Sequence, residues 1–195
     1  MKHGVYVREQ KTSVSTPVVA ESGVPFVVGT APVHSAESPA AIYTPVLCTD
    51  WEDAVKKLGY SDDWKTYTIC EVMYSHFKLF QRQPIIFCNV LDLSTNKEAV
   101  AGTEVTLSGR QAKLPFDAIL SSLVVKAASS SESALVKDTD YAAYYSDGNL
   151  IVETIEDGAA KAATKLFISY DKVKTSGIDD DDIVKGIEAI DLCMA

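Results

Sequence analysis

Histidine, paired cysteines and long apolar runs are scarce or absent in this 195-residue sequence. The four cysteines include no Cys-x-x-Cys pair, and a chain of this length is not a small disulfide framework. We interpret them as small apolar residues in a reducing compartment. No run reaches the roughly 18 apolar residues that a membrane helix needs, and no apolar segment after Met1 resembles a signal peptide. The cysteines are Cys48, Cys70, Cys88 and Cys193.

Positive charge is also in deficit. Lysine and arginine number 18 against 27 aspartates and glutamates, which gives a net charge of -9. This balance argues against binding to nucleic acids and to acidic membranes, because both are recognised by basic surfaces. Hydrophobic residues make up 47% and charged residues 23%, values typical of a globular chain that buries a core.

Sequence motifs that carry catalytic chemistry are missing as well. Gly29 follows an apolar stretch, where a phosphate-binding loop would begin, but the Gly-Lys-Ser/Thr ending of such a loop is absent. The aspartates at 179–182 lack the spaced ligand pattern of a calcium loop, and we interpret them as the start of a helix. His3, His34 and His76 form no metal-ligand pattern, and His76 is expected in a core or an interface. We therefore predict no catalytic residue, no cofactor and no metal ion.

The first 20 residues predict an extended arm. Residues 4–9 alternate apolar and polar side chains, as in a β-strand, and residues 11–17 are polar without a turn signal that would fold the chain back. Three basic residues against one acidic residue give the arm a net charge of +2 on an acidic chain. Such an arm is expected to pair with another molecule, or else to form an ordinary edge strand or a frayed end.

Residues 21–92 predict an α/β core. The apolar runs 24–29 and 85–90 are typical of strands buried on both faces. Between them we expect two helices, each opened by a Thr-x-x-Glu capping box, at Thr49 and at Thr68. The expected apolar face of the second helix consists of Ile69, Val72, Met73, His76 and Phe80. The two strands are therefore expected to lie parallel, in a βαβ-type unit.

Residues 93–175 predict an inserted, antiparallel β-rich domain. Its opening stretch, 93–103, is small and polar and is interpreted as a linker. Asp147-Gly148 is a strong hairpin signal because Asp-Gly tolerates positive φ. A helix that begins near residue 179 then returns the chain to the core. We thus predict an α+β fold, with an arm at 1–20, a core formed by 21–92 and 176–195, and the insertion between them.

Several of these stretches resemble, in the same order, the contractile phage tail sheath proteins. His3-Gly4-Val5-Tyr6-Val7-Arg8-Glu9 is similar to the H-G-V-Y-x-x-E opening of that family, and residues 23–32 resemble its G-V-x-x-x-V-G-x-A-P strand. Residues 49–92 resemble the helices and strand that follow, and residues 147–173 resemble the inserted β-domain. Members of the family are longer, so we expect this sequence to correspond to the N-terminal part of a sheath subunit.

The resemblance implies a structural protein without enzymatic activity. Sheath subunits assemble around an inner tube, and their arms add strands to the sheets of neighbouring subunits. On this basis Val5, Tyr6 and Val7 would form the donated strand, while Val27 and Phe87 would belong to the receiving sheet. The implied partners are other sheath subunits, the inner tail tube protein, the baseplate and the tail terminator. The implied location is the virion tail, assembled in the bacterial host cytoplasm.

Other functions stay open from the sequence. The same subunit would serve in a phage-like contractile bacteriocin or in a defective prophage. A small cytoplasmic enzyme built on the βαβ unit would need a pocket of convergent polar groups. A carbohydrate-binding β-module would need an open aromatic face, for which Tyr141, Tyr144 and Tyr145 are the candidates.

Overall fold

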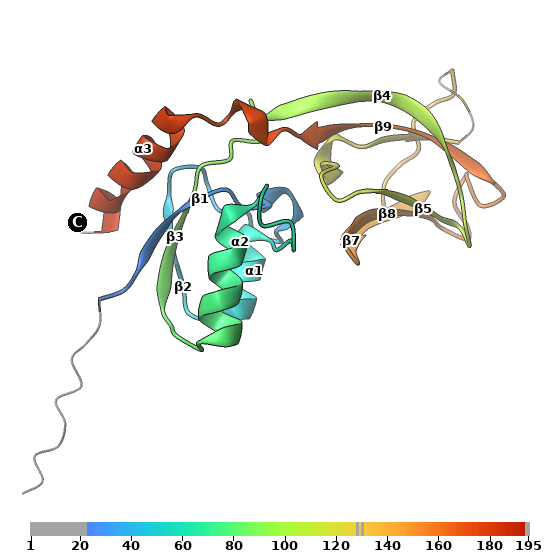
Figure 1. Cartoon of the computed structure of the whole chain (residues 1–195). Helices are drawn as coiled ribbons and strands as arrows, with labels where there is room; N and C mark the ends of the chain where they lie inside the picture. Colours follow the sequence, from blue (N-terminus) through green and yellow to red (C-terminus); the bar gives the residue numbers. More distant parts are fainter. Residues whose placement is uncertain (1–22, 128, 130, 194–195) are drawn as a thin grey trace, which may run out of the picture.

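The computed structural model describes residues 23–127, 129 and 131–193, so the predicted arm with Val5, Tyr6 and Val7 lies outside the described residues. An α/β lobe and a β lobe lie side by side (Figure 1). Three small three-stranded sheets and three α-helices make up these described parts, a mixture compatible with the α+β prediction. Among the described residues, no helix combines the length and the apolar character needed to cross a bilayer.

The central strand of the α/β lobe is β3 (Ile85–Asn89). It pairs in parallel with β1 (Phe26–Gly29) and antiparallel with β2 (Pro45–Cys48), in the order β1-β3-β2. The predicted parallel pairing of the two apolar runs is therefore confirmed. The strand β2 was not predicted, because four residues show too little alternation to identify a strand from sequence.

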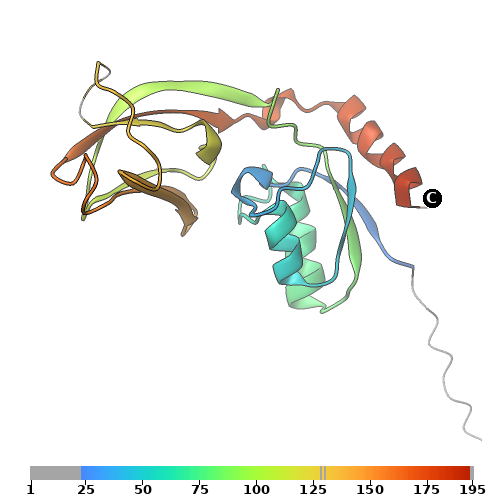
Figure 2. The same ribbon diagram turned by 180° about the vertical axis from the view of Figure 1, so that it is seen from behind.

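Helices cover both faces of this sheet, as the two opposite views show (Figures 1 and 2). On one face, α1 (Trp51–Leu58), α2 (Thr68–Met73) and the π-helical turn η2 (Tyr74–Leu79) enclose an apolar core. On the other face lie α3 (Asp180–Glu188) and the 3-10 turn η5 (Ala189–Cys193). Fully buried side chains of the first core include Leu58, Ile69, Met73, Ile85 and Phe87.

The predicted capping boxes of α1 and α2 are wrong, although both helices begin close to the expected residues. Asp50 caps α1 in place of Thr49, because its side chain accepts a hydrogen bond from the backbone N–H of Asp53 at 2.8 Å. Thr68 is the first residue of α2, and its hydroxyl accepts a hydrogen bond from the backbone N–H of Thr30 at 3.1 Å. The Thr68 hydroxyl, which the local pattern assigned to the helix cap, therefore forms a long-range hydrogen bond with Thr30 instead.

The π-helical turn changes which side chains of the second helix reach the core. Phe80 N–H donates to the carbonyl oxygen of Ser75 at 2.9 Å, which is the five-residue spacing of a π turn. This wider turn alters the direction of the side chains that follow. Phe77 is buried, whereas Phe80, which was expected on the apolar face, is 69% exposed. His76 is partly buried at this end of the helix.

Two antiparallel sheets make up the β lobe, in the strand orders β4-β9-β6 and β5-β8-β7. Apolar side chains from both sheets, among them Leu114, Leu150 and Ile168, form its core. The predicted Asp-Gly hairpin is confirmed, since Asp147 and Gly148 both have positive φ, 49° and 68°, between β7 and β8. The strands are β4 (Lys97–Thr106), β5 (Gln111–Pro115), β6 (Val124–Lys126), β7 (Tyr141–Ser146), β8 (Asn149–Thr154) and β9 (Lys165–Val173). Short 3-10 turns are η1 (Val33–Ser35), η3 (Leu120–Ser122) and η4 (Thr175–Gly177).

The prediction that residues 93–103 form a linker is wrong. Most of this stretch belongs to β4, which pairs with β9 and has a register shift between Val100 and Thr103. Small and polar side chains suit this strand because it lies at a sheet edge and is largely exposed. Gly102 leaves space for the aromatic ring of Phe167, since a Cβ at position 102 would lie 2.1 Å from Cε1 of that ring.

Candidate strand-addition site

The outer edge of β1 carries the candidate site. The carbonyl oxygens of Pro25 and Gly29 accept hydrogen bonds, each at 2.9 Å, from the N–H groups of Ile86 in β3 and of Val90 directly after it. In a parallel ladder, alternate residues direct their backbone groups to the same neighbouring strand. The odd-numbered residues of β1 therefore face β3, and the even-numbered residues face outward.

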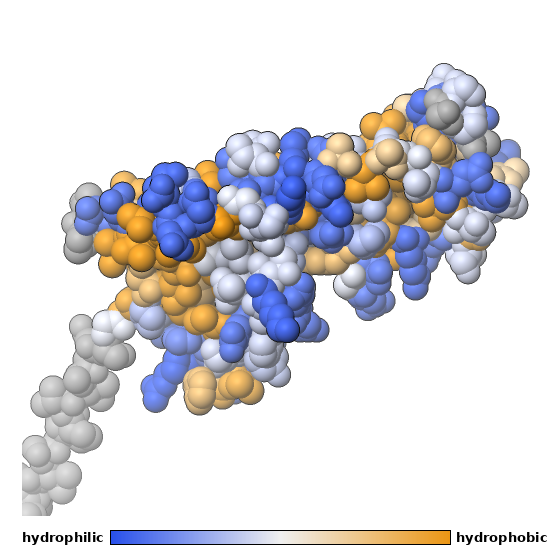
Figure 3. Space-filling model, turned by 45° about the horizontal axis from the view of Figure 1, so that its top comes forward, coloured by the Kyte–Doolittle hydropathy of each residue, from blue (hydrophilic) through white to orange (hydrophobic). Residues whose placement is uncertain are grey.

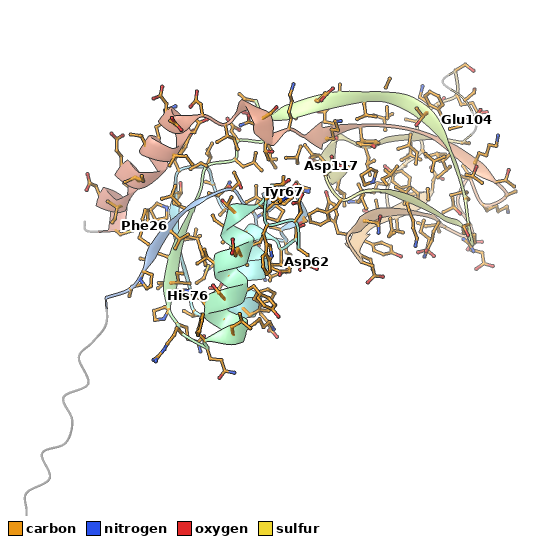
Figure 4. All side chains as sticks on the ribbon, in the orientation of Figure 1. Phe26, Asp62, Tyr67, His76, Glu104 and Asp117 are labelled. Atoms are coloured by element: carbon orange, nitrogen blue, oxygen red, sulfur yellow. The ribbon has the colours of Figure 1, made fainter. Side chains whose placement is uncertain are left out.

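Two residues of β1 consequently present unpaired backbone groups. Thr30 closes the upper end of the outer edge, because Ile69 N–H donates to its carbonyl oxygen at 3.0 Å and its own N–H donates to Thr68. Phe26 and Val28 have no strand beside them among the described residues. Each supplies one N–H donor and one C=O acceptor that an added strand would satisfy. Figure 4 shows Phe26 on β1, on the side of the α/β lobe away from the β lobe.

The other edge of the sheet, along β2, is protected against strand addition. Pro45 has no N–H to donate. Leu47 faces outward, because its partner Ile86 directs its N–H to β1, and Lys57 Nζ donates to the Leu47 carbonyl oxygen at 2.8 Å. A proline and a lysine are common means of blocking an exposed strand edge. Of the two edges, β1 is therefore the one that accepts a strand.

The structure places the two predicted receiving residues, Val27 and Phe87, next to each other in the sheet. Val27 packs partly buried against the core beneath α1 and α2, and Phe87 is fully buried in it. Phe87 belongs to β3, whose backbone is already paired on both sides. Both side chains support the receiving sheet, while the backbone that meets an added strand belongs to Phe26 and Val28. Phe26 and Val28 could not be identified from the sequence, because no sequence pattern shows which residues of a strand direct their backbone groups outward.

An apolar surface adjoins this edge. Gly186 packs α3 closely against the sheet, because a Cβ there would lie 2.4 Å from Val28 Cγ1 and 2.6 Å from Val90 Cγ1. The helix α3 therefore packs against the sheet through Gly186, while Val184 and Ile187 remain exposed. Figure 3 shows apolar surface over α3 and the strands beside it. Such a surface beside an open edge is typical of a protein-binding region.

The three buried cysteines are poorly suited to nucleophilic chemistry. Burial raises the pKa of the thiols of Cys48, Cys70 and Cys88 to about 11 in each case, so the reactive thiolate is disfavoured. Within residues 23–127, 129 and 131–193, no set of three or more His, Cys, Asp or Glu side chains is placed to hold a metal ion.

The tyrosines proposed for a carbohydrate-binding face do not share one surface. Tyr141 is buried in the core of the β lobe. The hydroxyl of Tyr145 donates to the carbonyl oxygen of Ala118 at 2.7 Å, and the ring faces the α/β lobe. Tyr144 alone is exposed, and its hydroxyl donates to Glu153 at 2.9 Å. These contacts favour packing roles for the three side chains.

Comparison with known proteins adds no relative to this picture. The chain matches no protein-family model, no curated protein and no solved structure.

Proposed function

We propose that this chain is the N-terminal part of a contractile tail sheath subunit, a structural protein that polymerises around an inner tube. The resemblance of ordered sequence segments motivates the proposal. The single structural observation that supports it best is the open outer edge of β1 at Phe26 and Val28, beside a sheet whose other edge is blocked. In a phage this subunit would work in the virion tail, and in a contractile bacteriocin the same subunit would do the same work.

In this proposal, the arm of one subunit adds a strand to β1 of its neighbour. Main-chain hydrogen bonds to Phe26 and Val28 supply the pairing, and alternate apolar side chains of the arm, Val5 and Val7, cover the adjoining surface. The basic arm and the acidic chain attract each other at low ionic strength. Contraction is then a rigid-body rearrangement of subunits that stay linked through their arms and drive the tube through the host envelope.

Deletion of residues 1–16 tests the donated strand. We expect the shortened chain to keep the circular dichroism spectrum of the full chain, because the described core does not include those residues. We expect the full chain to form large species in sedimentation velocity and the shortened chain to lose them. A matched control replaces residues 4–9 by the same residues in a scrambled order, which keeps length and charge but removes the apolar alternation.

Two results would contradict the proposal. Loss of the fold on deletion would show that the arm belongs to its own core. Equal assembly of the deleted, scrambled and full chains would show that the arm does not link subunits. In material from producing cells, antibody label along striated tubes in negative-stain micrographs is the expected result. Label confined to monomer-sized protein would instead favour an enzyme or a binding module.

A further inference from the structure

A cleft of about 670 Å³ lies where the two lobes meet. Its walls come from the loop between α1 and α2 on one side, and from the end of β5, the β7–β8 hairpin and the end of β9 on the other. This volume is in the range of sites that hold small ligands or single side chains. Figure 4 shows Asp62, Tyr67 and Asp117 around this junction.

Two buried polar atoms in the cleft wall have no hydrogen-bond partner in the part of the chain that the structure describes. Tyr67 is 2% exposed, and its hydroxyl makes no hydrogen bond with any described residue. Oδ1 of Asp117 is likewise buried and accepts no hydrogen bond from residues 23–127, 129 and 131–193. Burial raises the pKa of Tyr67, and the charges of Asp117 and Asp63 raise it further, so both carboxylates lie within electrostatic reach of the phenol. A buried acceptor without a donor is costly, which points to a group that the cleft is built to receive.

The chemistry of the lining residues is acidic and aromatic. The lining residues include Asp62, Asp63 and Asp117 but no lysine, arginine or histidine. None of these three carboxylates forms an ion pair with a described residue. Asp63 accepts a hydrogen bond from Thr66 N–H at 3.3 Å, which holds the loop in place. The rings of Tyr60, Tyr67 and Phe116 supply aromatic faces. Carboxylates and aromatic faces together attract organic cations.

We propose that this inter-lobe cleft binds an organic cation, an ammonium or a guanidinium group that donates hydrogen bonds to Asp117 and Tyr67. A metal ion is a poorer occupant, since the described residues offer no cluster of ligands for one. The cation is either a free polyamine or the basic side chain of another protein molecule. Because its partners come from both lobes, the bound cation links the two lobes. The inference does not depend on the sheath function.

Saturation-transfer difference NMR on the full chain tests this inference, because it reports ligand binding to monomers and to large assemblies. The probes are spermidine for a free polyamine and N-acetyl-argininamide for a protein side chain. We expect saturable binding of at least one probe, and the tighter of the two identifies the source. Asp117→Asn removes the charge but keeps the shape, and we expect it to weaken binding by about tenfold or more. Tyr67→Phe removes only the hydroxyl, and we expect a smaller loss.

Glu104→Gln is the matched control, since it removes one carboxylate charge at the far end of the β lobe (Figure 4). It should leave binding unchanged. If neither probe binds, or if Glu104→Gln weakens binding as much as Asp117→Asn does, the inference is wrong. The second outcome would mean that cations collect on the acidic surface as a whole.

Discussion

His34 Nε2 donates a hydrogen bond to the carbonyl oxygen of Phe116 at 2.9 Å, which joins the two lobes across 82 positions of sequence. The imidazole also contacts the rings of Phe116, Tyr67 and Tyr145, with centroid distances of 5.2, 5.9 and 5.6 Å. Its other nitrogen, Nδ1, is buried and has no hydrogen-bond partner in the described chain. His34 thus packs as a neutral ring at the lobe junction.

The stability of the protein should depend on the protonation of His34. Burial lowers its pKa from 6.5 to about 4, although the bond to Phe116 acts in the opposite direction. Between these pH values the unfolded chain binds the proton and the folded chain does not. The free energy of unfolding should therefore be highest above pH 6.5 and fall as the pH drops to 4, by up to about 3 kcal/mol from this group. Urea denaturation of wild type and His34→Gln over this pH range measures the difference, and parallel profiles would contradict the prediction.

Asn89 satisfies three backbone groups at the end of β3. Its Oδ1 accepts from the N–H groups of Ala31 and Leu91, at 3.0 and 3.1 Å, and its Nδ2 donates to the Leu91 carbonyl oxygen at 3.0 Å. The side chain is 1% exposed, so water cannot replace it. We expect Asn89→Ala to lower the free energy of unfolding by about 2–4 kcal/mol. Asn149 is only partly buried and donates to the carbonyl oxygen of Asp147, so Asn149→Ala, measured by the same urea titration, should cost less than about 1 kcal/mol. Similar losses in both variants would refute this assignment.

Gly186 sets the distance between α3 and the sheet. In most helix interiors Gly→Ala is stabilising, but here the added Cβ meets Val28 and Val90 at less than 3 Å. Valine side chains are short and stiff, so α3 must move. We expect Gly186→Ala to destabilise the chain by about 1–3 kcal/mol, measured by thermal unfolding. Gly23→Ala is the control because its Cβ meets no atom within 4 Å. A Gly186→Ala variant as stable as wild type would contradict the close approach.

Phe26→Pro should block strand addition without breaking the sheet. Proline removes the N–H that faces outward and leaves the bonds between β1 and β3 intact. Phe26→Ala loses the same side chain but keeps the N–H, and is therefore the matched control. We expect the concentration needed for assembly to rise roughly tenfold or more in Phe26→Pro relative to Phe26→Ala. Sedimentation velocity measures this concentration. Equal values for the two variants would show that the outer edge of β1 does not receive the added strand.

Local patterns predicted those parts of the fold that depend on neighbours in sequence. The apolar runs around Phe26 and Phe87 predicted two strands, of which β3 is buried and β1 only partly so, and the helices between them required a parallel pairing. Asp147-Gly148 predicted its hairpin because few other residue pairs adopt positive φ. The strands and the hairpin were predictable because apolar runs and turn residues act within a few residues, and the parallel pairing followed from the helical crossover between the strands.

Contacts between distant residues decided what sequence patterns could not. The pairing of Thr30 with Thr68 displaced a helix cap and closed one end of the β1 edge. Lys57 closed the β2 edge through the Leu47 carbonyl oxygen, although nothing near Leu47 in sequence indicates it. The strand β4 formed from a polar stretch because β9 supplied its backbone partners.

The sequence by itself determined the two apolar strands, the Asp147-Gly148 hairpin and the resemblance on which the sheath proposal rests, because apolar runs and turn residues act locally. Only the tertiary structure decided which strand edge is open and that Asp117 and Tyr67 share a cleft with Asp62. Both depend on hydrogen-bond direction and burial, and these arise when segments far apart in the chain meet.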